Sequence, residues 1–148
     1  MSKSIIKTRD FEEVEIDTEA VLKFSDGLFA FENSKNFALL SPLGEGDYPM
    51  WLQSTEDENL CFIVFSPYAV MEEYKPTITE EMKKMIELDN EDDLRFLVIA
   101  VVPENFKKST VNLKSPIIVN NKKGTAAQVI LEDDYQLRFP IFTDRGDR

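Results

Sequence analysis

The segment from Phe96 to Asn120 constrains the fold more than any other part of the chain. It begins with Phe96 to Val102, FLVIAVV, a run of apolar residues rich in β-branched side chains. Such a run is too short to span a membrane and predicts a strand that is buried on both faces. Pro103 ends the run, because proline has no N–H group to donate to a neighbouring strand.

A second strand is predicted from Thr110 to Asn120, after a polar connection. Here Val111 and Leu113 alternate with Asn112 and Lys114. This alternation is typical of a strand with one buried and one solvated face. We therefore expect two paired strands, one central and one half-exposed, against which the other segments pack.

The rest of the chain contains further short apolar or alternating segments separated by turn residues. Strands are predicted at residues 5–9, 14–16, 20–24, 37–40, 50–53, 60–65, 127–131 and 135–139. The loop 121–124, NKKG, predicts a hairpin turn in which Gly124 takes the left-handed conformation. Many short strands with turns between them favour a mainly β fold, a small antiparallel β-barrel-like single domain.

One short helix is predicted over residues 77–88. Thr77 and Glu80 have the spacing of a capping box, which satisfies free amides at a helix start. Four apolar residues fall on one helical stripe that would dock on the sheet: Ile78, Met82, Met85 and Ile86. The acidic segment DNEDD (89–93) that follows lacks the pattern of a calcium loop and predicts a solvated turn.

The composition of the chain limits the functions that it can have. The 148 residues carry a formal net charge of −11 and include no histidine. This charge repels nucleic-acid phosphate and favours basic protein partners, so no direct nucleic-acid binding is expected. No apolar run is long enough for a membrane span, and the N-terminus lacks the pattern of a signal peptide, so we expect a cytoplasmic protein.

Reactive groups are scarce. Without histidine, and with Cys61 as the only cysteine, the sequence predicts no metal site, no cofactor and no enzymatic activity. Carboxylates are plentiful, so a carboxylate-dependent hydrolase or a small-ligand-binding β-barrel stays open as an alternative. Either would need a large cavity inside the barrel. We expect the interior to be filled instead by Leu22, Phe62, Val64, Val98, Ala100 and Val129.

The sequence resembles the FliW family of bacterial flagellar assembly factors over nearly its whole length. TVNLKSPIIVN (110–120) is similar to the family's T-V-N-L-K-A-P-I signature, and VPENFKKS before it resembles a V-P-E/D connection. Two further blocks of the family, L-Q-S and apolar-N-P, are resembled by WLQS (51–54) and by the apolar run 60–65 followed by SP (66–67). A glycine-containing segment of the family is kept at Phe24, Gly27, Leu28 and Phe31. Its two prolines are replaced here by Ser25 and Phe29.

The resemblance implies a single FliW-like domain over residues 1–148, with a flexible tail from about 142. It also implies a non-enzymatic protein that binds two others. One is flagellin, which is held before export. The second is CsrA, a basic translational repressor of flagellin synthesis that the protein would antagonise when free of flagellin.

A contact surface for such a basic partner is predicted from acids that the fold does not need. Glu72 and Glu73 precede the predicted helix, and Asp92 and Asp93 follow it. Tyr68 and Tyr74 are expected to act as amphipathic anchors beside them, because tyrosines often carry interface energy while charges set the association rate.

Overall fold

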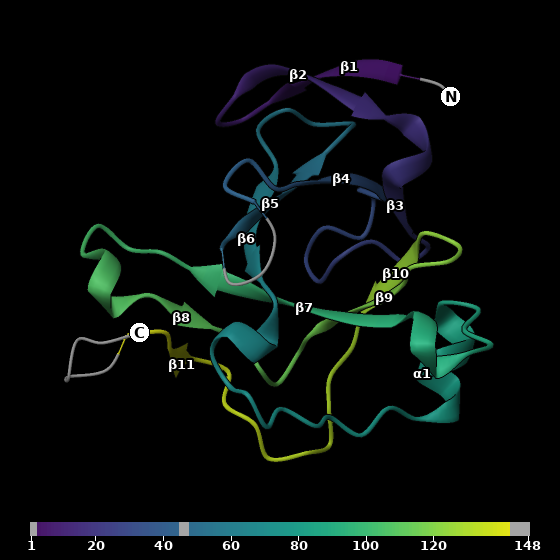
Figure 1. Ribbon diagram of the computed structural model, residues 1–148, viewed down its shortest axis with the longest axis vertical. Coiled ribbons are helices and arrows are strands. Elements are labelled where there is room, and N and C mark those ends of the chain that lie inside the picture. The colour runs from purple at the N-terminus through teal and green to yellow at the C-terminus, as the bar shows by residue number, and fades with distance from the viewer. Residues whose placement is uncertain (1–2, 45–47, 143–148) are drawn as a thin grey trace.

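Two strands from the segment 94–120 lie side by side at the centre of the molecule, as the sequence predicts (Figure 1). We describe a computed structural model that covers residues 3–44 and 48–142. Strand β7 (Leu94–Val101) is antiparallel to β9 (Ile117–Asn120) and, further along the same strand, to β8 (Thr110–Val111). Val98 and its neighbour Leu97 are fully buried on opposite faces, whereas the end of β7 is exposed at Val101.

The predicted strand 110–120 is interrupted, and this differs from the expectation. The side-chain carbonyl of Asn112 accepts hydrogen bonds from the amides of Lys114 and Ser115 at 3.1 and 2.9 Å. This Asx-type turn bends the chain between β8 and β9. Val111 and Leu113 are buried as predicted, but all four residues of β9 are buried, so this part has no solvated face.

The described residues form eleven strands, whereas the sequence predicts ten. The remaining strands are β1 (Lys3–Thr8), β2 (Glu12–Asp17), β3 (Val21–Phe24), β4 (Asn36–Leu40), β5 (Met50–Ser54), β6 (Cys61–Phe65), β10 (Thr125–Gln128) and β11 (Phe139–Pro140). The helices are α1 (Glu80–Met85) and the short 3-10 turns η1 (Thr18–Ala20), η2 (Pro67–Ala69), η3 (Glu91–Asp93) and η4 (Phe106–Lys108). The last predicted strand, 135–139, shrinks to two residues.

Seven strands close into a barrel in the order β7, β6, β5, β4, β3, β10, β9 and back to β7. Figure 1 shows this ring, with the β1–β2 hairpin outside it next to β4 and β5. Each pair in the ring is antiparallel except β3 with β10, which are parallel. Gly124 has a φ of 72° in the β9–β10 turn, as its position predicted. The expected mainly β barrel with one short helix is confirmed.

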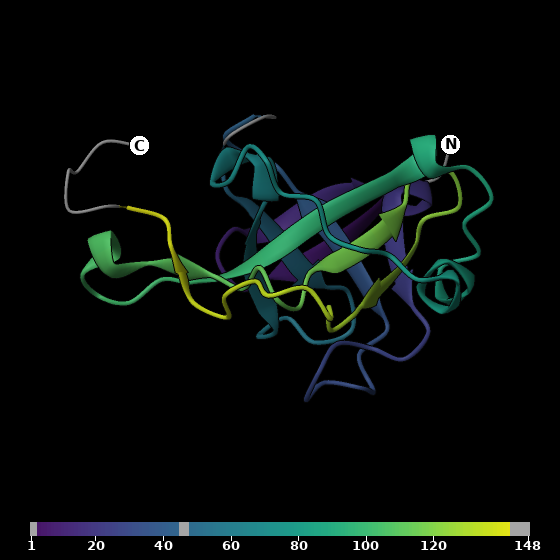
Figure 2. The ribbon, with the colours of Figure 1, turned by 90° about the horizontal axis from the view of Figure 1, so that it is seen from below.

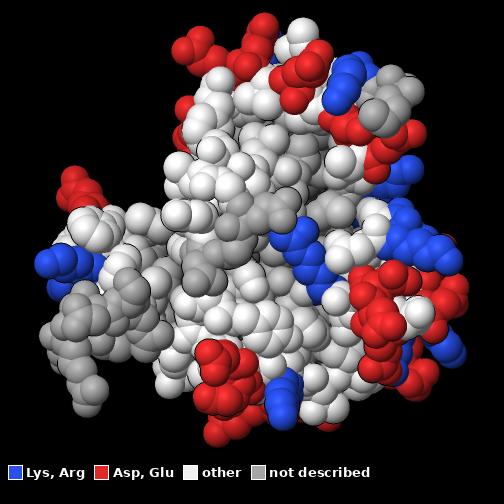
Figure 3. Space-filling model, in the orientation of Figure 1, with Lys and Arg blue, Asp and Glu red and all other residues white. Residues whose placement is uncertain are grey.

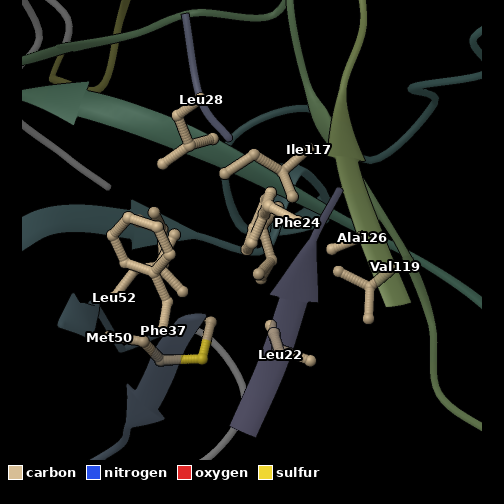
Figure 4. Close-up of a cluster of buried hydrophobic side chains, with 11 residues drawn as sticks. Leu22, Phe24, Leu28, Phe37, Met50, Leu52, Ile117, Val119 and Ala126 are labelled. Carbon is tan, nitrogen blue, oxygen red and sulfur yellow. The ribbon is translucent and has the colours of Figure 1, made fainter. Parts of the chain in front are cut away.

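The buried apolar side chains form two separate clusters. The inner core fills the barrel and consists of Leu22, Phe24, Leu28, Phe37, Met50, Leu52, Val64, Leu97, Ile117, Val119 and Ala126 (Figure 4). The outer core lies on the other face of β7 and β9, beneath the chain segments 70–88 and 129–142. Its buried members are Val70, Tyr74, Ile86, Val98, Val111, Leu113, Ile118, Ala127, Val129, Leu131 and Ile141.

The outer core corrects the expected contents of the barrel. Leu22 and Val64 point inward as predicted, and Phe62 packs partly buried against the inner core. Val98, Ala100 and Val129 instead belong to the outer core. Along β7, the apolar residues that face the interior are Leu97 and Ile99.

Helix α1 is shorter than predicted and starts later. Thr79, rather than Thr77, caps it by accepting a hydrogen bond from the Met82 amide at 3.1 Å. Ile86 at its end is fully buried in the outer core, but Met85 is 38% exposed. The helix therefore docks on the barrel through part of the predicted stripe. Apart from residue 142, the expected tail lies outside the described residues.

Candidate protein-binding surfaces

The residues predicted to contact a partner lie on the connection from β6 to β7, residues 66–93. Hydrogen bonds tie this connection to the segment 129–142 and to the barrel. The amide and hydroxyl groups of Thr77 donate to the Asp133 carboxylate at 3.0 and 2.8 Å, which lowers the pKa of that carboxyl. At the far end the side-chain amide of Asn120 donates to the Ile86 carbonyl at 3.1 Å. The connection thus has a fixed position on the outer face.

Tyr74 is part of the packed structure and not of a contact surface. Its side chain is 1% exposed, and its hydroxyl donates to the Leu113 carbonyl at 2.7 Å. Its ring lies 4.7 Å from that of Tyr135, and burial raises the pKa of the phenol. The prediction that Tyr74 offers an accessible anchor is therefore wrong, because a partner cannot reach the ring.

Tyr68, Glu72 and Glu73 form the first candidate surface, which we call the η2 patch. Tyr68 is 48% exposed, and both glutamates are exposed. Among the described residues, neither glutamate forms an ion pair. The patch combines an accessible aromatic ring with two acids that the fold does not use, as the sequence predicts.

Asp92 and Asp93 belong to a second acidic surface, the α1–η3 patch, which also contains Glu80, Glu81, Glu87, Asp89 and Glu91. Asp92 is exposed and Asp93 is half-buried. Part of this charge is compensated locally, because the Lys83 ammonium lies 2.8 Å from Glu91 and 3.2 Å from Glu80. The hydrogen bond from the Lys83 ammonium is also the main reason why the pKa of the Glu91 carboxyl is lowered.

The structure does not bring the two patches together. Figures 1 and 2 both show the segment after β6 well apart from α1 and from the turn that leads into β7. Figure 3 shows the acids gathered in separate groups near the edges of this face. The single contact surface predicted from sequence is therefore two surfaces.

Exposed apolar residues mark a further surface that sequence reasoning did not single out. The arm formed by the end of β7, η4 and β8 leaves Val101, Val102 and Phe106 64%, 51% and 57% exposed, respectively. Figures 1 and 2 show this arm extending away from the barrel. The signal was present in the sequence, since the apolar run continues to Val102 beyond the residues that the barrel covers.

The geometry also bears on the alternative of a ligand-binding or hydrolytic barrel. Apolar side chains fill the described barrel, so it does not provide the interior cavity lined by paired acids that this alternative needs. In residues 3–44 and 48–142 no group of three or more acids or cysteines is arranged to hold a metal ion. Cys61 is 7% exposed, and burial raises the pKa of its thiol to about 11, which agrees with a structural thiol.

Within the described part of the chain no helix is long and apolar enough to cross a membrane.

Comparison with known proteins gives a consistent result. The family model described as "FliW protein" matches residues 4–141. Flagellar assembly factor FliW of Caldicellulosiruptor bescii is 35% identical over 96% of this chain and 93% of its own length. The protein of the same name from Bacillus subtilis (strain 168) is 38% identical over 93% of this chain and 96% of its own.

A solved structure agrees with these sequence relatives. The crystal structure of a flagellar assembly factor FliW superimposes with a TM-score of 0.88 and 26% identity, covering 96% of this chain and 99% of the other. The fold and the sequence thus point to the same relatives. The chain belongs to the FliW family.

Proposed function

We propose that this protein is a cytoplasmic flagellar assembly factor that acts by binding other proteins and not by catalysis. It holds flagellin before export. When free of flagellin, it binds a CsrA-type translational repressor and so relieves the repression of flagellin synthesis. No nucleic acid or membrane takes part directly in either binding event.

Family membership over residues 4–141 is the observation that carries this proposal. The surface supports it independently. A net charge of −11 disfavours contact with RNA and favours a basic protein such as a repressor that itself binds RNA. The η2 patch adds an exposed tyrosine to two acids, a combination suited to an interface that is steered by charge and held by an aromatic anchor.

Binding of the purified proteins tests the proposal. The chain is mixed separately with flagellin and with the CsrA-type repressor of the same organism, and each mixture is analysed by size-exclusion chromatography at about 0.15 M salt, where charge interactions extend ~8 Å. A stable complex is expected in each mixture. If the chain migrates alone in both mixtures, the proposal fails.

Charge reversal in each acidic patch is expected to slow association with the repressor. Two variants separate the patches, Glu72→Lys with Glu73→Lys and Asp92→Lys with Asp93→Lys. The η2 variant should show the larger decrease in association rate, because both of its acids are exposed and lie within five residues of the exposed Tyr68 in the sequence, whereas Asp93 is half-buried and Lys83 already compensates part of the α1–η3 patch. The difference from wild type should shrink as salt screens the charges. Rates are measured by surface-immobilised binding at two ionic strengths.

A matched control reverses two acids on the β1–β2 hairpin, Glu13→Lys with Glu15→Lys. This variant has the same net charge as the others, but its exposed substitutions lie on a different part of the molecule (Figure 1). Its association rate should change less than that of the η2 variant. The free energy of unfolding of all three variants should stay within about 0.5 kcal/mol of wild type. Equal slowing in all three variants would show that net charge alone acts and that the η2 patch is not the contact surface.

A further inference from the structure

A cavity of about 730 Å³ opens at the end of the barrel where β7 begins. Its apolar lining comes from the inner core and its edge, and its polar lining comes from the β9–β10 turn and from β7. Residues that define it are Leu22, Leu39, Met50, Tyr68, Arg95 and Lys122. The volume falls within the range of roughly 300–1,000 Å³ that is typical of small-molecule sites.

Arg95 is the feature of this cavity that the fold does not explain. It lies two residues before Leu97 on β7 and opposite Val119 on β9, and both of these residues belong to the inner core. Because strand side chains alternate between faces, Arg95 is directed towards the barrel interior at its mouth. Its Nη2 lies 3.5 Å from the sulfur of Met50, which is 3% exposed.

The guanidinium of Arg95 has no carboxylate partner among the described residues. A thioether is a weak acceptor, so nearly all the donor capacity of the group stays available. Lys122, on the same cavity, likewise forms no described ion pair. Lys123 is partly compensated, with its ammonium 3.7 Å from Glu87. Among the described residues that line the cavity, Glu19 is the one acid. Figure 3 shows basic side chains near the centre of this face and acids near its edges.

We propose that this cavity binds a small organic anion in which a carboxylate is attached to an apolar stem. The planar guanidinium of Arg95 forms paired hydrogen bonds with the carboxylate, a geometry for which arginine is suited. Lys122 adds positive charge, and the stem lies over the apolar surface of Leu22, Leu39 and Met50. A molecule that is strongly acidic overall thus has a basic, partly apolar site at one barrel mouth.

Titration with octanoate tests this site. In ¹H–¹⁵N spectra of the labelled protein, octanoate should shift the Arg95 Nε–H signal and the amides of residues 121–124 in a saturable way. Arg95→Met keeps a long apolar stem on Met50 but removes the charge and the donors. Its affinity for octanoate should fall by about 10–100-fold, which corresponds to one charge-assisted contact. Octanol, which lacks the carboxylate, should bind the wild type more weakly by a similar factor.

The matched control is Arg138→Met. Arg138 lines a different cavity together with Ile99, at the opposite end of the barrel, and its loss should leave octanoate affinity unchanged. Arg95→Lys keeps the charge without the paired donors and should show an intermediate affinity, which also covers the case in which Arg95→Met does not fold. The proposal is overturned if octanoate leaves the Arg95 signal unmoved, or if Arg95→Met or Arg95→Lys binds octanoate as tightly as wild type.

Discussion

Replacing Val111 with aspartate is expected to unfold the protein. Val111 is 1% exposed and pairs with Ala100 on β7 and with Phe139 on β11, so its side chain lies in the outer core. A carboxylate there would be buried without a partner, at a cost of about 3–5 kcal/mol. Small domains are stable by only ~5–15 kcal/mol in total. The variant should therefore lose most of its cooperative unfolding transition when circular dichroism is measured against urea concentration.

The control for this variant is Val101→Asp on the neighbouring strand. Val101 is 64% exposed, so its carboxylate stays in water, and the free energy of unfolding should change by about 0.5 kcal/mol or less. Together the pair separates burial from the chemical change itself. A Val111→Asp variant as stable as wild type would mean that the outer core does not exist as described.

Phe24→Ala tests the inner core and is expected to cost about 3–5 kcal/mol. Phe24 is fully buried, and its ring packs edge-on against Phe37 at 5.3 Å between centroids. Removal of the ring leaves a cavity inside a closed barrel, where the surrounding strands are held by hydrogen bonds and can collapse only in part.

The corresponding surface change is Phe29→Ala, at a side chain that is 45% exposed. It should cost less than half as much, as judged from urea unfolding at constant m-value. Equal losses for Phe24→Ala and Phe29→Ala would argue against a filled barrel and would favour the ligand-binding alternative.

The central strand pair was predictable because its signal is local. A β-branched apolar run ended by Pro103 predicts β7, and turn residues around Gly124 predict the β9–β10 hairpin. Which face of β7 points into the barrel was not predictable. Leu97 and Val98 are both fully buried, so hydrophobicity does not distinguish the inside from the outside. The distinction comes from the outer core, which is built by residues far away in the sequence.

The candidate surfaces were only partly predictable for a related reason. The exposure of Glu72 and Glu73 follows from their charge, whereas a tyrosine suits both a core and a surface. Tyr74 is buried in the outer core, where the turn between β8 and β9 presents the Leu113 carbonyl to its hydroxyl. The distance between Asp92 and Glu72 depends on the path that the chain takes across the barrel, and this path could not be predicted from the sequence. The inward direction of Arg95 likewise follows from strand pairing and is not visible in the sequence.

Competition between the two proposed partners is the most direct test of the account. The complex of this protein with a CsrA-type repressor is formed first, and flagellin is then titrated into it while the free repressor is measured by its binding to flagellin messenger RNA. Flagellin is expected to release the repressor, and RNA binding should return in proportion to the flagellin added. If the protein leaves RNA binding by the repressor unchanged before any flagellin is added, the central claim is contradicted.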